Sequence, residues 1–156
     1  MEIVEIIGDN YLGHFEHLRY ASRAVIIKDK MILLSYETKK DLWMIPGGGM
    51  EDDEIASDTA IREVREETGY IIKPSDIVLE IDEYYGNSKY VSYYFLGEIV
   101  GMTNRKLTEG EEKDGLEPRW IPVEEALAIF SNYMNCSQEE KQGMYYREYS
   151  ALKRIC

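Results

Sequence analysis

The residues best suited to chemistry in this 156-residue sequence are three neighbouring glutamates, Glu63, Glu66 and Glu67. On a helix, which turns about 100° per residue, their side chains fall within an arc of roughly 100°. Carboxylates held so close repel one another and raise each other's pKa values. A hard divalent cation such as Mg²⁺ or Mn²⁺ prefers oxygen ligands and would relieve this repulsion. The spacing therefore indicates a metal site. The alternative is a solvated helix face, because glutamate is a good helix former.

The apolar residues of the same segment favour the metal site. Ala60 and Val64 belong to the face that we expect to pack on the core. Glu63 and Glu67 fall at the edge of that face, whereas Arg65 falls on the opposite, solvent side. A carboxylate that is half inserted into a protein is costly without a counter-ion. These two glutamates therefore need a cation more than ordinary surface acids do.

The segment before the helix offers further oxygen ligands. Pro46 ends an extended piece predicted over Leu42–Ile45, since the residue before a proline is disfavoured in helical conformation. Glycines at 47–49 leave the backbone bare, so that an ion can approach the carbonyl of Gly48 or Gly47.

The caps predict a helix from Glu54 to Thr68. Asp52 and Asp53 are placed to supply the N-cap and the acids of the first turn, and Gly69 is placed to end the helix in left-handed conformation.

The full spacing of this region resembles a known motif. Gly48, five residues, Glu54, seven residues and then the run REVREETGY over 62–70 match the Nudix box, Gx5Ex7REUxEExGU, where U is a bulky apolar residue. Tyr70 stands where an aliphatic residue is usual, and Asp53 stands where many members have glycine.

This resemblance implies a fold and an activity. The implied fold is α/β, an α/β/α sandwich with a mixed β-sheet and a loop–helix–loop catalytic motif, formed by residues 1–156 as one domain. The implied activity is that of a pyrophosphohydrolase, which cleaves a nucleoside diphosphate linked to another moiety by attack of water at phosphorus. The implied cofactor is Mg²⁺ or Mn²⁺. A non-catalytic nucleotide sensor on a similar fold is the alternative function.

The resemblance also assigns roles within the box. Glu63, Glu66 and Glu67 would be metal ligands together with the backbone carbonyl of Gly48. Glu66 is the first choice for activating the water, with Glu63 beside it. Arg62 would orient Glu66 through an i to i+4 contact. The alternative for Arg62 is an ordinary surface salt bridge.

A second candidate for the base lies later in the chain. Some Nudix enzymes use a glutamate from a later loop, and the acidic segment 108–115 is the candidate here. Glu112 is the best placed by resemblance, with Glu109 and Glu111 close behind. The alternative is a charged loop without a catalytic role.

The sequence says little about the substrate. Tyr84 and Tyr85 are weak candidates for stacking on a base, although aromatic residues in strands more often serve packing.

Composition limits the partners and the location. A net charge of −12 and a pI near 4.6 argue against a nucleic-acid polymer or an anionic membrane as partner. No apolar run approaches 18 residues, so we expect no membrane span. The first ten residues do not resemble a secretory signal. The two cysteines, Cys136 and Cys156, are expected to be reduced. These features predict a cytoplasmic protein. The small-molecule nucleotide substrate is what the resemblance implies, and the sequence leaves open whether the protein forms a homodimer.

Several further elements are expected around the box. The predicted strands cover Ser22–Ile27, Met31–Tyr36, Ile77–Tyr85, Tyr90–Val100 and Arg119–Pro122, and the predicted helices cover Val123–Phe130 and Gln138–Arg154. Ser137 and Glu140 form a capping-box pattern for the last helix.

Overall fold

A long antiparallel hairpin forms the centre of the larger sheet in the computed structural model, which describes residues 1–156. Its strands are β7 (Tyr70–Tyr85) and β8 (Ser88–Met102), joined at Gly86 and Asn87. Gly86 has a φ of 55°, which glycine adopts without strain. The structure therefore confirms the two predicted strands, Ile77–Tyr85 and Tyr90–Val100, and extends both of them.

Two N-terminal strands complete this sheet from opposite sides. β1 (Glu2–Ile7) runs parallel to β7, and β2 (His17–Val25) runs parallel to β8. The short strand β6 (Gly47–Gly49) pairs with the other edge of β2. The sheet is therefore mixed, in the order β1-β7-β8-β2-β6. The glycines expected in a loop are thus held as a short edge strand.

A smaller sheet is built around one central strand. β4 (Met31–Glu37) pairs with three antiparallel neighbours. The turn before it uses Asp29 and Lys30, with φ values of 53° and 64°, as a two-residue hairpin loop requires. The three neighbours of this strand are β3 (Ile27–Lys28), β5 (Leu42–Met44) and β9 (Leu116–Pro122).

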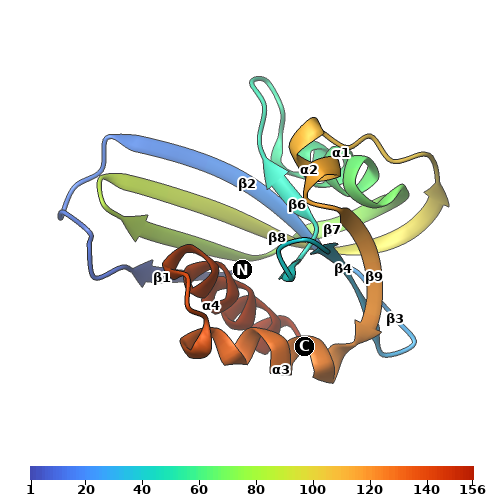
Figure 1. Ribbon diagram of the computed structural model, residues 1–156. Helices are drawn as coiled ribbons and strands as arrows, with labels where there is room; N and C mark the ends of the chain where they lie inside the picture. The colour runs from blue at the N-terminus through green and yellow to red at the C-terminus, as the bar shows by residue number, and fades with distance from the viewer.

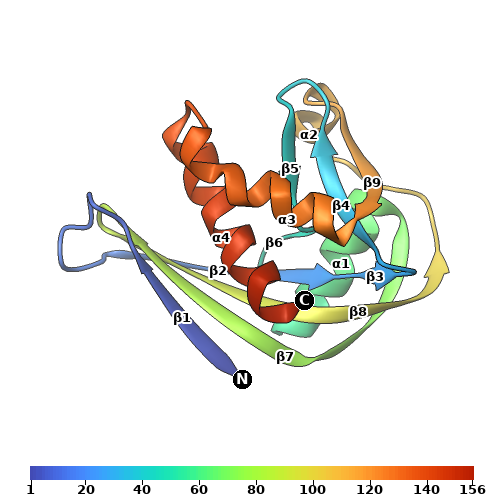
Figure 2. The same cartoon turned by 90° about the horizontal axis from the view of Figure 1, so that it is seen from below.

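Helices cover both faces of the sheets (Figures 1 and 2). α1 (Ala56–Thr68) lies on one face, and α3 (Val123–Ser131) and α4 (Glu139–Ile155) lie on the other, linked by the 3-10 turn η1 (Asn132–Asn135). The short helix α2 (Glu109–Lys113) lies next to the start of β9. This arrangement confirms the α/β/α sandwich with a mixed sheet. None of these helices combines the length and the apolar character needed to cross a membrane.

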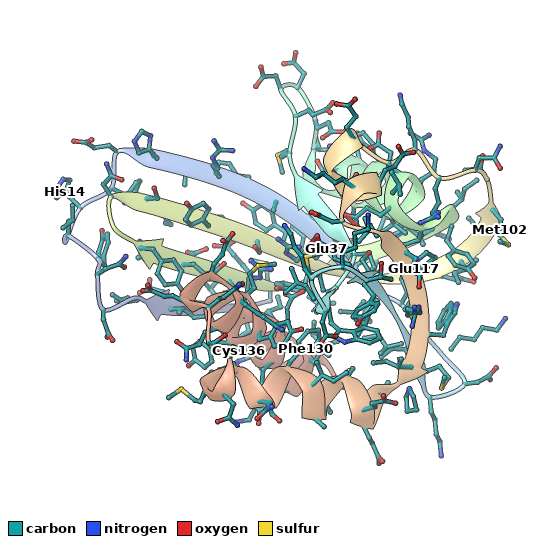
Figure 3. The ribbon with its side chains drawn as sticks, viewed as in Figure 1. His14, Glu37, Met102, Glu117, Phe130 and Cys136 are labelled. Atoms are coloured by element: carbon teal, nitrogen blue, oxygen red, sulfur yellow. The ribbon has the colours of Figure 1, made fainter.

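The core has one part on each side of the sheet. The larger part lies against α3 and α4 and includes Tyr94, Phe130 and Leu152, which are fully buried. The smaller part, beneath α1, includes Ala24 and Val64. Figure 3 shows Phe130 on the side of α3, and His14 and Met102 at opposite ends of the molecule.

The N-terminus of α1 differs from its prediction. The helix begins at Ala56, and its N-cap is Ile55, whose side chain caps nothing. Asp52 and Asp53 therefore do not cap it. Asp53 has a φ of 66°, so the chain is still turning at this point. The helix does end as predicted, at Gly69 with a φ of 81°.

The predicted capping box of α4 is also wrong. The N-cap of α4 is Gln138, without a side-chain hydrogen bond, so Ser137 and Glu140 form no box. The same pattern is realised at Thr108 and Glu111, where both reciprocal hydrogen bonds form and begin α2. The acidic segment 108–115 is therefore partly helical.

Candidate active site

Glu67 is a buried acid without a cationic partner. It lies near the end of α1, and only 6% of its surface is exposed. Its Oε2 accepts hydrogen bonds from Ser35 Oγ at 3.2 Å and from the backbone N–H of Gly47 at 3.3 Å. Burial raises its pKa to about 8, and the negative charges of Glu63 and Glu111 contribute to the shift. The side chain therefore sits where a negative charge is costly unless a cation joins it.

Glu63 packs directly on the glycine strand. A Cβ added to Gly48 would lie 2.6 Å from the Cδ of Glu63, so any larger residue would displace the carboxylate. Burial raises the pKa of Glu63, although Arg62 counteracts part of this effect. The structure thus brings together Glu63 and Gly48, two residues that the sequence assigns to one site.

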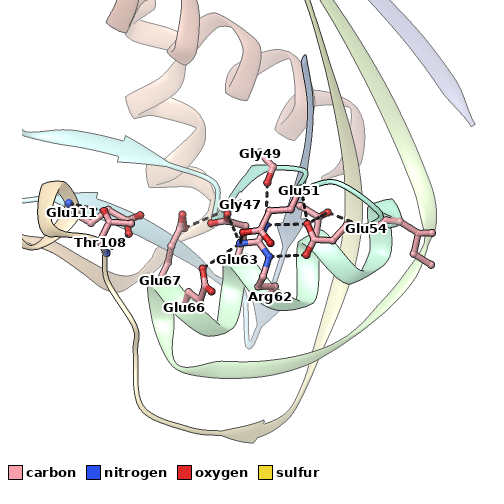
Figure 4. A network of polar contacts seen from close by, with 12 residues as sticks. Gly47, Gly49, Glu51, Glu54, Arg62, Glu63, Glu66, Glu67, Thr108 and Glu111 are labelled. Atoms are coloured by element: carbon pink, nitrogen blue, oxygen red, sulfur yellow. Dashed lines mark hydrogen bonds and ion pairs between the residues drawn. The ribbon is translucent and has the colours of Figure 1, made fainter. Parts of the chain in front are cut away.

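Arg62 connects the acids of the box (Figure 4). Its side chain is only 16% exposed, and Nε donates to Glu54 Oε2 at 2.6 Å. Nη1 donates to Glu63 at 2.9 Å and to Glu66 at 3.2 Å, and Nη2 donates to the carbonyl of Gly49 at 3.0 Å. The i to i+4 contact with Glu66 is therefore present. With this many partners, Arg62 is no loose surface salt bridge.

Glu54 anchors that arginine. The hydrogen bond from Arg62 is the main reason why the pKa of Glu54 falls to about 2. Glu54 also accepts from the Thr59 hydroxyl and from the backbone N–H of Glu51, both at 2.9 Å. Its carboxylate is fully engaged and ties the loop before α1 to the helix.

The donor set suits a hard divalent cation. Glu63, Glu66 and Glu67 offer carboxylate oxygens beside the backbone of Gly47 and Gly48, which is the chemistry that Mg²⁺ and Mn²⁺ prefer. The three carboxylates do not converge on one point in this structure, because Arg62 Nη1 contacts two of them. Within this set, Glu67 supplies a carboxylate that no cation of the chain pairs with.

Glu111 of segment 108–115 lies on the side of α2 near the box acids (Figure 4). The backbone N–H of Thr108 donates to Glu111 Oε1 at 2.9 Å, which fixes the side chain on α2. Its negative charge contributes to the raised pKa values of Glu63 and Glu67. Glu112 is exposed and makes no side-chain hydrogen bond. The capping-box pattern was the signal in the sequence that could have singled out Glu111.

The two candidate tyrosines lie on opposite faces of the sheet, as neighbours on a strand do. The ring of Tyr84 lies 5.2 Å from that of Tyr11, and Lys89 Nζ lies over it at 5.3 Å. Tyr85 faces α4 and lines a pocket with Arg23. Burial raises the pKa of Tyr85 to about 12. Tyr85 therefore borders a cavity, and Tyr84 packs against other side chains.

The sequence did not indicate one buried acid that fixes the backbone leading into the site. Glu148 of α4 is fully buried and accepts from the backbone N–H of Ile45 and from Tyr94 Oη, both at 2.7 Å. Arg147 Nε donates to it at 3.1 Å. Burial alone would raise the pKa of Glu148, but Arg147 and Arg23 outweigh it, and the pKa lies below its ordinary value. Glu148 thus holds the strand that leads into the glycines.

Comparison with known proteins adds to this geometry. Residues 17–136 match the family model described as the NUDIX domain. Diphosphoinositol polyphosphate phosphohydrolase 3-alpha of Mus musculus is 31% identical over 105 residues, which cover 65% of this chain and 60% of that protein. A provisionally named ADP-ribose pyrophosphatase of Bacillus subtilis is 24% identical over 116 residues, which cover 73% of this chain and 54% of that protein.

These matches therefore span little more than half the length of the curated relatives. Among solved structures, the NUDIX hydrolase from Nitrosomonas europaea matches with a TM-score of 0.62 and 23% identity. The match covers 85% of this chain and 88% of that one and supports the fold.

Proposed function

The chain belongs to the NUDIX domain family, and from this premise we propose that it is a metal-dependent pyrophosphohydrolase. It would cleave a nucleoside diphosphate linked to another group, by attack of water at one phosphorus. The names of the two curated relatives, a phosphohydrolase and a pyrophosphatase, support this reaction class.

The observation that carries the proposal is the buried, uncompensated Glu67 beside Glu63. A carboxyl whose pKa lies at about 8 is poorly suited to an isolated site and well suited to a site that binds a cation. Glu63, Glu66 and Glu67 would hold Mg²⁺, or Mn²⁺ in its place, with a backbone carbonyl of Gly48 or Gly47. When bound, the ion neutralises phosphate charge and lowers the pKa of a coordinated water.

The remaining roles follow from the contacts of each side chain. Arg62 donates twice to Glu54, at 2.6 and 3.0 Å, so it keeps its position when Glu63 and Glu66 turn toward the ion. Glu66 is the first candidate for accepting the proton of the attacking water, a step that contributes about 10²–10⁴-fold. Glu111 is the second candidate and takes precedence over Glu112 because its charge acts on Glu63 and Glu67.

The experiment is a hydrolysis assay with Mg²⁺ or Mn²⁺ on nucleoside diphosphate sugars, dinucleoside polyphosphates and nucleoside triphosphates. Glu66→Gln and Glu67→Gln should abolish metal-dependent hydrolysis, while circular dichroism shows an intact fold. Asp58→Asn is the matched control, because Asp58 lies on the same helix and is exposed. If the wild type binds nucleotides yet hydrolyses none of the panel, the protein is a nucleotide sensor and the proposal fails.

A further inference from the structure

Ser35 is the one polar residue in the buried part of β4. The three residues before it in the strand, Ile32, Leu33 and Leu34, are apolar and fully buried, and Ser35 itself is only 1% exposed. Side chains alternate between the two faces of a strand, so Ser35 lies on the same face as Leu33, which packs beneath α1. A hydroxyl group in this position is shielded from water and is costly unless it forms a hydrogen bond.

The hydrogen-bond partner of this hydroxyl group is the buried acid of the box. Ser35 Oγ donates to Glu67 Oε2 at 3.2 Å, and the backbone N–H of Gly47 donates to the same oxygen at 3.3 Å. The two donors come from β4 and β6, and the acceptor belongs to α1, so three elements meet at one carboxylate oxygen. Ser35 lies 32 positions before Glu67 and outside the box, and no other side chain donates a hydrogen bond to this acid.

The two carboxylate oxygens of Glu67 therefore differ. Oε2 accepts both hydrogen bonds, whereas Oε1 accepts none. Oε1 is nevertheless not one of the fully enclosed side-chain atoms without a partner, a group that includes Oδ1 of Asp82 and Oγ of Ser22. The small exposed part of Glu67 thus includes Oε1, and the negative charges of Glu63 and Glu111 act on this carboxylate. An accessible carboxylate oxygen without a hydrogen bond, in a field of other acids, is suited to binding a hard cation.

Ser22 provides a comparison with Ser35 within the same protein. It is also fully buried and lies on β2, opposite Gly48 of β6. Its side chain is on the same side of its strand as that of Ala24, which packs beneath α1. Its Oγ, however, has no hydrogen-bond partner. The two serines share residue type, burial and the side of the fold that α1 covers, but only Ser35 forms a hydrogen bond with an acid of the box.

We propose that Ser35 is a positioning residue of the metal site, and that together with the N–H of Gly47 it holds Glu67 so that Oε1 is the oxygen offered to the cation. This inference rests on the proposed function, because it takes Glu67 as a metal ligand. A hydrogen bond to one oxygen of a ligating carboxylate fixes the direction of the other, and losing such a contact typically weakens metal binding about 10–100-fold. Ser35 acts through Glu67 and does not itself touch the cation.

The test measures the binding of Mn²⁺ to metal-free protein without substrate, from the electron paramagnetic resonance signal of the free ion. Ser35→Ala should raise the Kd for Mn²⁺ about 10–100-fold. Ser35→Thr keeps the hydroxyl group and should stay within about threefold of the wild type. Ser22→Ala is the matched control and should bind Mn²⁺ like the wild type, because its hydroxyl group has no partner to lose. Circular dichroism verifies folding, and if Ser35→Ala does not fold, Ser35→Cys takes its place because a thiol is a weak donor.

Hydrolysis assays distinguish positioning of the metal ligand from general damage to the structure. In Ser35→Ala, the Mg²⁺ concentration that gives half the maximal rate should rise about 10–100-fold, whereas kcat at saturating Mg²⁺ should stay within about threefold of the wild type. A variant with a damaged structure would instead have a low kcat at every Mg²⁺ concentration.

The outcomes separate this inference from the proposed function. If Ser35→Ala binds Mn²⁺ as tightly as the wild type, or if Ser35→Thr or Ser22→Ala binds it as weakly as Ser35→Ala, the hydroxyl group of Ser35 does not position Glu67. The inference is then overturned, even if the protein hydrolyses its substrates. If Ser35→Ala alone weakens Mn²⁺ binding and the wild type hydrolyses none of the panel, the positioning role stands and the enzymatic function is refuted.

Discussion

Replacing Glu148 by glutamine should weaken the fold and the active site together. The carboxylate of Glu148 accepts three hydrogen bonds, from Ile45, Tyr94 and Arg147, and is fully buried. Glutamine has almost the same shape but no charge, and one of its two terminal groups is a donor. The substitution therefore changes electrostatics and hydrogen bonding without leaving a cavity.

The magnitude follows from these contacts. The less costly orientation of the amide keeps its oxygen toward Tyr94 and Arg147 and turns its NH₂ toward the N–H of Ile45. A buried donor left without an acceptor costs about 1–3 kcal/mol. Arg147 also loses one of its two carboxylates and keeps only Glu83 at 3.5 Å. Breaking a buried ion pair costs about 3–5 kcal/mol in total. We therefore expect the free energy of unfolding to fall by about 3–5 kcal/mol.

Urea denaturation at pH 7 measures this loss, and Tyr94→Phe is the matched comparison. Tyr94→Phe removes one donor and leaves the carboxylate paired, so it should cost only about 1–2 kcal/mol. Kinetics at a temperature where both variants are folded supply the second measurement. Glu148→Gln should lower kcat/KM about tenfold or more, because Ile45 leads into the glycine strand and small displacements are costly in catalysis. Tyr94→Phe should stay close to the wild type.

The pH dependence supplies a further check. The folded-state pKa of Glu148 is depressed, so its contribution is present above the unfolded pKa of about 4.5 and is lost as the pH falls below that value. The difference between wild type and Glu148→Gln should therefore shrink on acidification below about pH 4.5. A loss under about 1 kcal/mol at pH 7, or a difference that grows on acidification, would refute this reasoning.

Three further predictions concern stability and the box. Gly48→Ala should reduce kcat/KM about 10²-fold, because its Cβ would lie 2.6–2.8 Å from the carboxylate atoms of Glu63. Gly49→Ala is the kinetic control and should leave kcat/KM nearly unchanged, because no atom lies within 4 Å of the added Cβ. Gly143→Ala should raise the free energy of unfolding by about 0.5–1 kcal/mol, because alanine is the better helix former inside α4. The nearest atom to the new methyl group is the Tyr85 hydroxyl oxygen, 3.5 Å away, so the methyl group fits. A lower free energy of unfolding in urea denaturation would contradict this prediction. Because the pKa of Glu67 is raised to about 8, its protonated form stabilises the metal-free protein at low pH. Stability should therefore fall by up to about 1.4 kcal/mol per pH unit as the pH rises from about 4.5 through 8. Unfolding in EDTA at several pH values should show this slope in the wild type and a clearly shallower one in Glu67→Gln, and equal slopes would contradict the role of Glu67.

The part of the site that could be predicted from the sequence is the part encoded within one helix. The spacing of Glu63, Glu66 and Glu67 follows from helical geometry, and Gly69 ends the helix by a local backbone preference. The start of the helix was misplaced because Asp53 takes a left-handed conformation and Glu54 bonds to Arg62 instead.

The parts that could not be predicted depend on contacts across the chain. Glu148 binds the backbone of Ile45 from 103 positions away, and no local pattern marks that pair. From the sequence, Arg147 and Glu148 would be assigned to the solvent-exposed face of α4, because charged side chains are usually exposed. They are buried because they neutralise each other and because Tyr94 supplies a donor. The pocket between α4 and the larger sheet could not be predicted for the same reason, because the residues that line it, such as Tyr85 and Arg147, come from distant parts of the chain.

The topology of the larger sheet fixes an order of assembly during synthesis. β1 and β2 are synthesised before the other strands of this sheet, yet they do not pair with each other. Each joins the β7–β8 hairpin along a different edge, with Glu2 opposite Leu79 and His17 opposite Ser88. β1 can pair with β7 only after the chain has been made to about Tyr84, and β2 can pair with β8 only after the chain has been made to about Leu96. Such non-local pairing slows folding and leaves strand edges exposed to aggregation meanwhile. The nascent chain therefore depends on early closure of the hairpin at Gly86, the one local step available to this sheet.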